Sequence, residues 1–308
     1  MKRWATKQAG FTIVELLIVV VVIAILAAIT VVAYTGIQNR AKDSSLKSTS
    51  AQAAKKLMTV AVQNNDSYPV DKSDFLAKTS TSESQSLEYI YLVTDSLKDF
   101  CLSVDNPSSA DNAYATTSSV SNPVPGTCIK NFIVNPSVES NLMGWTNRKT
   151  AVVTRTTSQQ HTGTASISVV TPGTESDEGV NLAVSSNAVP VGAAGNYTGS
   201  AWVKGTSGVV VRIFVEEYTG GGTYVAGAAS NLTLNGSWQR VSATKLISAD
   251  TSKVAVNVRT LSATATTFYV DDVMVNAGSR AYQYGDGSTL GWSWAGVPDN
   301  SYSIGPSN

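Results

Sequence analysis

The stretch Gly10-Phe11-Thr12-Ile13-Val14-Glu15-Leu16-Leu17 opens an apolar run that decides the fold of the N-terminal part of this 308-residue chain. From Phe11 to Tyr34 only Thr12, Glu15 and Thr30 interrupt it. As an α-helix, a run of this length would span about 36 Å, enough to cross the roughly 30 Å hydrocarbon core of a bilayer. The preceding segment holds three cations and no acid, namely Lys2, Arg3 and Lys7. The positive-inside rule therefore places this flank in the cytoplasm.

Glu15 distinguishes the run from an ordinary signal peptide or membrane anchor. A carboxylate inside a membrane helix costs roughly 2.5–3.5 kcal/mol or more unless it is paired. The apolar region of a signal peptide is also shorter, at about 7–15 residues. If the chain is cut after Gly10, the new α-amine of Phe11 would be available to Glu15 of a neighbouring subunit. The buried charge would then set the register between packed helices.

These residues closely resemble the processing site of type IV prepilins and pseudopilins, which is Gly, Phe, Thr, two free positions, Glu and Leu before a long apolar run. The resemblance implies cleavage after Gly10 by a prepilin peptidase and N-methylation of Phe11. It also implies helix-in-bundle assembly with other pilin subunits, with Glu15 at the contact. The precursor would sit in the inner (cytoplasmic) membrane, and the mature subunit in an extracellular surface filament.

The rest of the N-terminal half predicts one long helix and a small head, the α+β part of the fold. We expect a leader at 1–10, a pilin helix at 11–63 with 11–34 in the membrane, and a head at 64–130. After Tyr34 the apolar residues recur at helical spacing, and no proline lies between Phe11 and Asp66. The head has a predicted helical turn at 71–78, strands at 87–93, 100–104 and 113–120, and a turn at 108–111.

Few residues are available for metal or catalytic chemistry. Cys101 and Cys128 are the only cysteines and His161 is the only histidine. In an exported chain the cysteines predict one disulfide, which would restrain the unfolded chain by about 3 kcal/mol in the chain-entropy model; the alternative is two unpaired buried thiols. A zinc site or a Ser-His-Asp triad needs more such groups. Glu216 and Glu217 point to opposite faces of one strand, so they form no glycosidase pair, and we expect no enzyme.

Residues 131–276 predict an all-β jelly-roll sandwich, with strands at 164–170, 196–204, 208–217, 237–245, 253–260 and 267–275. Several stretches resemble the jelly-roll carbohydrate-binding modules of families 4 and 9. They are NFIVNPSVE at 131–139, GW at 144–145, HTG at 161–163, YTGSAWVK at 197–204, WQRV at 238–241 and FYVDDV at 268–273. Val138 departs from the pattern, because an aromatic residue commonly precedes the glutamate.

The resemblance to these modules implies a structural calcium ion at the edge of the sandwich. Its ligands would be Glu139 with Asp271 or Asp272, and backbone carbonyls would complete the shell of hard oxygens. The alternative is that the two aspartates only hydrogen-bond a turn.

A sugar-binding groove requires an aromatic face together with polar groups that bind hydroxyls. Alternation along 196–204 and 208–217 shows which side chains point away from the core. The predicted groove residues are Trp202, Arg212, Phe214 and Glu216. Asn257 and Arg259 would extend the groove from the next strand. The alternative is that a loop covers Trp202, since most tryptophans are largely buried.

Residues 277–308 form a small aromatic-rich C-terminal extension, which either packs on the jelly roll or exposes a contact patch. The whole sequence predicts a type IV pilus subunit that displays a carbohydrate-binding-like domain for surface adhesion, with a glycan as ligand. The alternatives are a purely structural pilin with the jelly roll as a spacer, or a pseudopilin of a secretion or DNA-uptake system. Removing the leader leaves 19 cations against 22 anions, or net −3. This balance disfavours nucleic acid as a partner.

Overall fold

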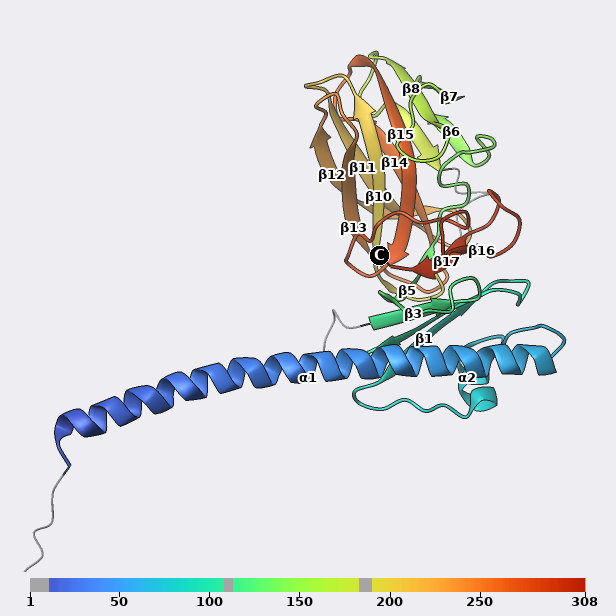
Figure 1. Cartoon of the computed structure of the whole chain (residues 1–308). Coiled ribbons are helices and arrows are strands. Elements are labelled where there is room, and N and C mark those ends of the chain that lie inside the picture. Colours follow the sequence, from blue (N-terminus) through green and yellow to red (C-terminus); the bar gives the residue numbers. More distant parts are fainter. Residues whose placement is uncertain (1–10, 108–112, 183–189, 308) are drawn as a thin grey trace, which may run out of the picture. The chain divides into compact units, whose positions relative to one another are not determined.

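The computed structural model of the chain describes residues 11–107, 113–182 and 190–307 (Figure 1). The predicted leader with Gly10, and the predicted turn at 108–111, lie outside these residues. The chain divides into two compact units, one up to Leu46 and one from Lys47 onward.

The long helix α1 spans Ile13–Gln63, as the sequence predicts. Thr12 and Glu15 form a capping box at its start. The Thr12 amide and hydroxyl both donate to the Glu15 carboxylate at 2.8 Å, and the Glu15 amide donates back to the Thr12 hydroxyl at 3.2 Å. The residue types and spacing are those of the Thr-x-x-Glu cap, which satisfies amides that lack a helical partner.

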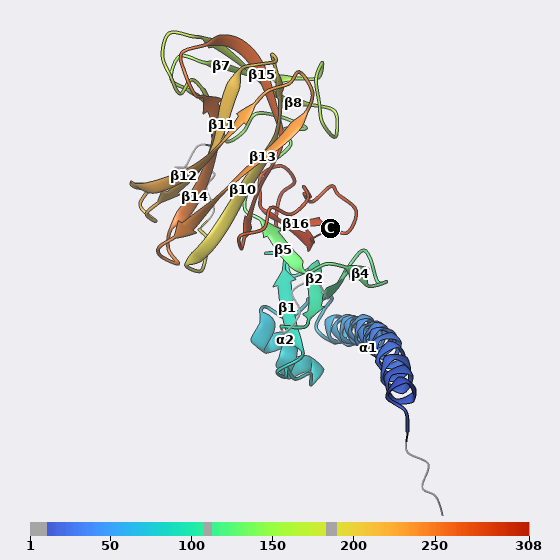
Figure 2. The same ribbon diagram turned by 90° about the vertical axis from the view of Figure 1, so that its left-hand side faces the viewer.

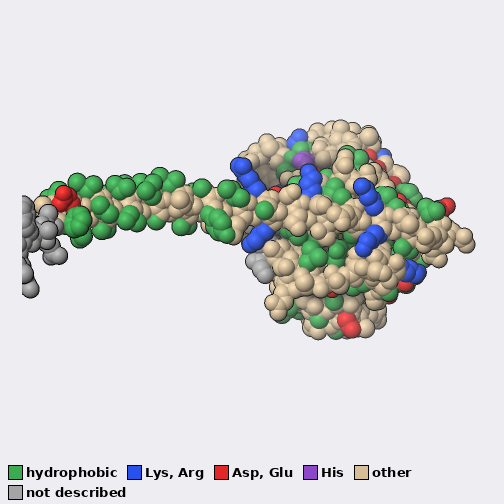
Figure 3. Space-filling model, turned by 60° about the horizontal axis from the view of Figure 1, so that its bottom comes forward, with side chains coloured by type: hydrophobic (Ala, Val, Ile, Leu, Met, Phe, Trp, Pro, Cys, Tyr) green, Lys and Arg blue, Asp and Glu red, His purple; other side chains and the backbone are tan. Residues whose placement is uncertain are grey.

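The N-terminal part of α1 is apolar on all sides. Its most apolar 18-residue window has a mean hydropathy of 3.4, and none of that window is buried. Among the described helices it alone is long and apolar enough to cross a membrane. Figure 3 shows hydrophobic side chains covering this part of the helix. A surface of this kind requires lipid or other apolar helices to cover it.

The head begins with the C-terminal end of α1. The Ser50 hydroxyl lies 3.3 Å from that of Thr116, and both residues are buried, so this end of the helix packs on a sheet. The sheet is antiparallel with the order β1-β2-β3-β4, made of Glu88–Val93, Phe100–Asp105, Ala113–Thr117 and Val124–Pro125. The helix α2 spans Lys72–Thr79. The predicted disulfide joins Cys101 and Cys128, whose Cα atoms are 5.7 Å apart.

Beyond the head lies a sandwich of two five-stranded antiparallel sheets (Figure 2). The first, here called the β10 sheet, has the order β13-β10-β15-β8-β7, made of Gln239–Ile247, Gly195–Gly205, Ala265–Ala277, Ser166–Pro172 and Val152–Thr156. The second, the β11 sheet, has the order β12-β11-β14-β9-β6, made of Tyr224–Thr233, Val210–Tyr218, Lys253–Thr260, Gly179–Leu182 and Trp145–Arg148. All six strands predicted for this region are present, which confirms the all-β sandwich.

The hydrophobic core fills the space between the two sheets. Val211, Ile213 and Val215 of β11 are fully buried, as the alternation predicted. Ala201 and Val203 of β10 face them from the other sheet and are equally buried. The intervening residues of both strands therefore point outward, away from the core.

The C-terminal extension packs against the sandwich and the head. Strands β16 (Ser293–Trp294) and β17 (Ser303–Pro306) form a sheet with β5 (Cys128–Asn131), in the order β16-β17-β5. Trp292 is 5% exposed and belongs to a cluster with Ile129 and Met274. Its indole lies where Cβ atoms of Gly285 and Gly305 would be, so both positions require glycine. The sequence left open whether the aromatic residues of the extension pack on the jelly roll or stay exposed, and Trp292 is packed.

Glu217 is fully buried at one end of the sandwich and anchors a polar loop. Its carboxylate accepts hydrogen bonds from the Ser248 amide at 2.7 Å and the Ser252 hydroxyl at 3.0 Å, and it pairs with Lys245 at 2.9 Å. Burial raises the pKa of Glu217, but these hydrogen bonds lower it further, to about 2. The native state therefore favours the ionised form strongly.

We expect acidification to destabilise the sandwich through Glu217. Because its folded pKa of about 2 lies below the ordinary value of 4.5, its contribution is complete above pH 4.5 and is lost as the pH falls towards 2. Thermal melts at pH 7, 4.5 and 3 should show a falling Tm, and Glu217→Gln should flatten that dependence. Glu175→Gln, which alters a surface ion pair with Lys149, is the matched control. Identical pH profiles for wild type and Glu217→Gln would contradict this assignment.

Candidate functional site

The structure separates Trp202 from the other predicted groove residues. Trp202 lies on β10, whereas Arg212, Phe214 and Glu216 lie on β11 of the opposite sheet. All four point away from the core, so they occupy the two opposite outer faces of the sandwich. The prediction of a single groove is wrong because β10 and β11, although consecutive in sequence, cross from one sheet to the other instead of pairing.

The outer face of the β11 sheet brings the three β11 residues together with the residues predicted to extend them. Arg212 pairs in register with Arg259 of β14, and Phe214 pairs with Asn257. Directly paired side chains on one face lie about 4.5–5.5 Å apart at Cβ. This neighbourhood agrees with the prediction from sequence, although a role in sugar binding stays a prediction.

The same register continues onto strands that the sequence did not connect with the site. Arg259 is paired with Gly179 of β9, and Gly179 with Arg148 of β6. Arg212, Arg259 and Arg148 therefore lie on one line across four strands, with Gly179 between the last two. We call these three residues the arginine row. The row was missed because β6 and β9 are only four residues long, too short to show a strand pattern in the sequence.

Phe214 supports two of the three guanidinium groups of the row. The guanidinium carbon of Arg259 lies 3.8 Å from the centre of the Phe214 ring, and that of Arg212 lies 5.2 Å from it. Such cation–π contacts hold the charges in place over an apolar surface. On the β12 side, a Cβ at Gly227 would lie 3.0 Å from the ring, so a larger residue there would press on Phe214.

Asp177, another residue that the sequence did not predict, binds two members of the row. Its Oδ1 accepts a hydrogen bond from Arg212 and lies 3.3 Å from Nε of Arg259. Burial raises the pKa of Asp177, but the Arg212 hydrogen bond and the charges of Arg259, Arg212 and Arg148 lower it further, below its ordinary value. For Arg259, burial and the charge of Arg148 lower the pKa.

This face concentrates the unpartnered polar atoms of the described residues. Across the described residues, eight buried side-chain atoms lack a hydrogen-bond partner. Five of the eight belong to this face: Nδ2 and Oδ1 of Asn257 and Nε of Arg148, Arg212 and Arg259. Asn257 is 1% exposed and Arg259 5%. Since buried polar groups are nearly always hydrogen-bonded, these atoms mark a place where a ligand would supply partners.

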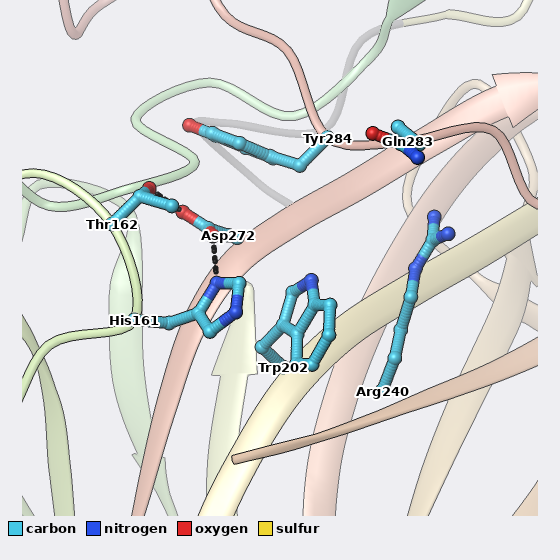
Figure 4. Close-up of a pocket in the computed structure, with 7 residues that line it drawn as sticks. All are labelled: His161, Thr162, Trp202, Arg240, Asp272, Gln283 and Tyr284. Atoms are coloured by element: carbon cyan, nitrogen blue, oxygen red, sulfur yellow. Dashed lines mark hydrogen bonds and ion pairs between the residues drawn. The ribbon is translucent and has the colours of Figure 1, made fainter. Parts of the chain in front are cut away.

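Trp202 lines a separate pocket of about 230 Å³ on the outer face of the β10 sheet (Figure 4). Its ring stacks on His161 with centroids 3.8 Å apart, and Figure 4 shows it between His161 and Arg240. Nδ1 of His161 lies 2.6 Å from Oδ2 of Asp272. The loop that carries His161 thus covers one side of Trp202, which matches the alternative considered from the sequence.

The three predicted metal ligands hydrogen-bond this loop. Glu139 accepts from the Thr164 amide at 2.8 Å, and Asp271 accepts from the His161 amide at 2.7 Å. Asp272 accepts from the Thr162 hydroxyl at 2.6 Å. Within the described ranges, no group of three or more His, Cys, Asp or Glu side chains is placed so that it could hold a metal ion.

The adjacent carboxylates at 271 and 272 influence each other. Burial and the neighbouring Asp272 raise the pKa of Asp271 to about 8, and burial likewise raises the pKa of Asp272. The side chains present fit the role of hydrogen-bonding the loop better than that of a complete cation shell, and calcium stays a prediction.

Two family models match the chain. The "Prokaryotic N-terminal methylation motif" covers residues 5–31, and the "Carbohydrate binding domain" of families 4 and 9 covers residues 130–264. The chain therefore carries a type IV pilin N-terminal motif and a carbohydrate-binding domain, as the residues indicated. Both are non-catalytic kinds of domain. No curated protein matches the chain.

Among solved structures, the chain is similar to the CBM22-2 xylan-binding domain of Paenibacillus barcinonensis Xyn10C, with 21% identity over 46% of this chain and 98% of that one, at a TM-score of 0.39. It is also similar to the CBM22-1 xylan-binding domain of the same enzyme. The identity is 19% over 47% of this chain and 94% of that one, and the TM-score is 0.37. A third similarity is to the CBM22-1–GH10 modules of Clostridium thermocellum xylanase 10B. The identity is 18% over 50% of this chain and 30% of that one, and the TM-score is 0.40.

Proposed function

We propose that this chain is a type IV pilus subunit that assembles through α1 and displays a glycan-binding sandwich for adhesion to a surface. The observation that carries the proposal is the presence on one chain of the methylation motif and the carbohydrate-binding domain. The partners are other pilin subunits, a prepilin peptidase and a glycan. The precursor resides in the inner membrane and the mature subunit in the surface filament.

The predicted division of the chain belongs to this proposal. The helix at 11–63 is the assembly element, the head at 64–130 supports it, and the sandwich at 131–276 is the binding module. The extension at 277–308 joins the last two through β17, which pairs with β5.

We place the glycan site on the outer face of the β11 sheet. Phe214 supplies apolar surface there, Glu216 and Asn257 supply hydrogen-bonding groups, and the arginine row supplies further donors. The Glu216 carboxylate accepts from the Tyr218 hydroxyl at 2.8 Å and keeps capacity for a ligand hydroxyl. Carbohydrate sites combine an apolar surface with convergent polar groups in this way.

Phe214→Ala is expected to weaken glycan binding by about thirtyfold, the equivalent of a 2 kcal/mol hot spot. The change removes both the apolar surface and the ring that supports Arg259. The measurement is a glycan-array screen of the full-length chain in detergent micelles, with and without calcium, followed by titration of the glycan bound. Calcium-dependent binding would support the predicted cation.

Trp202→Ala is the matched control, because it removes an aromatic residue from the opposite face. We expect it to leave binding unchanged. Loss of binding in Trp202→Ala alone would move the site to the pocket of Figure 4. A folded chain that binds no glycan would instead favour a structural pilin whose sandwich is a spacer.

A further inference from the structure

We infer that the outer face of the β11 sheet binds an acidic sugar, whose carboxylate lies on the arginine row. The inference rests on the proposed function, since it takes the sandwich to bind glycans. It goes beyond that function by naming the class of ligand, namely uronic acids and other sugars that carry a carboxylate.

The charge on this face is positive by one, because the three guanidinium groups of the arginine row face two carboxylates, Asp177 and Glu216. Asp177 is the acid that pairs with the row, and it binds Arg212 and Arg259. In the described part of the chain, Arg148 has no acidic side chain within 4.0 Å; its Nη1 donates to Oδ1 of Asn181 at 3.3 Å. An anion therefore gains more on this face than a neutral ligand of the same shape.

Gly179 separates two members of the arginine row without adding a side chain to this face. It stands in register between Arg259 and Arg148 and places no side chain between them. A Cβ at this position would overlap the backbone of β14, so the strand requires glycine here. Arg259 and Arg148 therefore flank β9 with no side chain between them in the register, and Nε of Arg148 has no hydrogen-bond partner.

Asn257 indicates that the anion is part of a sugar. Its amide nitrogen and oxygen both lack partners although the residue is 1% exposed, and it is paired in register with Phe214. An amide offers both donors and an acceptor, which suit the hydroxyl groups of a sugar. A simple anion has no hydroxyl groups to pair with them. A carboxylate beside vicinal hydroxyls satisfies both the arginine row and Asn257.

Asp177 shows that this place already accommodates a carboxylate. A ligand carboxylate would compete with it for Arg212 and Arg259, because each guanidinium has a limited number of free N–H groups. Asp177→Asn removes this competitor and keeps the shape. The backbone φ of 67° at this residue also suits asparagine, which tolerates the left-handed region.

The test uses the full-length chain in detergent micelles, with oligogalacturonate and oligoglucuronate as probes and the carboxyl-reduced form of each as its neutral counterpart. We expect at least tenfold preference for one acidic form, weakening as salt is raised. Arg148→Gln should abolish the preference and Asp177→Asn should increase it severalfold. Arg280→Gln, which changes an exposed arginine outside this face, should leave it unchanged.

The outcomes separate this inference from the function on which it rests. Binding of neutral glycans with no preference for either acidic probe would overturn the acidic-sugar assignment and leave glycan binding intact. Preference for an acidic probe that survives Arg148→Gln and Asp177→Asn unchanged would overturn the assigned position. Absence of binding to every glycan on the array would reject the proposed function itself.

Discussion

Glu15→Ala is expected to reduce filament yield well over tenfold while cleavage after Gly10 continues. In the proposed filament the Glu15 carboxylate is buried among apolar helices and pairs with the α-amine of Phe11 on a neighbouring subunit. Removing one partner of a buried pair leaves the other charge uncompensated, at a cost of about 3–5 kcal/mol. The measurements are the yield of sheared filaments and the N-terminal mass of the membrane-bound subunit.

The structure gives Glu15 a second role that this experiment must separate from the first. Within its own chain the carboxylate caps α1 through the Thr12 amide and hydroxyl. Glutamine at the same position retains the cap, since capping boxes accept either residue, but it carries no charge. We therefore expect Glu15→Gln to fail in assembly as Glu15→Ala does.

Thr12→Ala is the reciprocal control. It removes the hydroxyl partner of the cap but keeps the carboxylate, and loss of a cap costs about 1 kcal/mol. Assembly should therefore be reduced only mildly. Normal filaments from Glu15→Gln, together with defective ones from Thr12→Ala, would show that capping rather than charge pairing explains the role of Glu15.

Trp292→Ala is expected to destabilise the unit from Lys47 onward by about 3–5 kcal/mol, the range for removing a large aromatic from a packed core. Trp292 fills the space between Gly285 and Gly305 and packs on Ile129 and Met274. Its removal leaves a cavity, because backbone atoms of two glycines line the site and cannot collapse into it. Denaturant unfolding of the full-length chain, followed by far-ultraviolet circular dichroism, measures the loss.

Leu290→Ala is the matched control for this substitution. Leu290 lies two residues earlier in the same segment and is 84% exposed, so its truncation should change stability by less than about 0.5 kcal/mol. An equal and small effect of both variants would show that the extension contributes little to the fold.

The helices and strands predicted from the sequence are those whose residues show a clear hydrophobic pattern of the matching kind. The apolar run that forms the N-terminal part of α1 is long and nearly uninterrupted, and the residues of β11 alternate between partly and fully buried as far as Val215. Strand β12, by contrast, was missed. Its residues 224–233 read YVAGAASNLT, which are mostly small, and most of its side chains are exposed or only partly buried. Small residues have weak strand preference and produce little contrast between the two faces, so the pairing with β11 decides this strand.

The candidate site was predicted in part for a related reason. Alternation shows that Trp202 and Phe214 point outward, but it does not show to which of two sheets each strand belongs. Arg148 and Asp177 come from segments that precede β11 by many residues and that join it only through β9 and the loop before it. Long-range strand pairing of this kind has no local signature in the residues themselves.

The pairing of β17 with β5 affects the order in which an exported chain can finish folding. In the proposed export route, residues 128–131 would reach the outside of the membrane long before residues 303–306, to which they are paired. Until then the head carries an open strand edge, an arrangement prone to incorrect pairing. The backbone bond from Ser307 to the Thr127 carbonyl, at 2.7 Å, forms at the same late stage. In the proposed export route, only a chain translocated through these residues would complete this pairing, so an incomplete subunit would expose its unpaired strand to proteases before filament assembly.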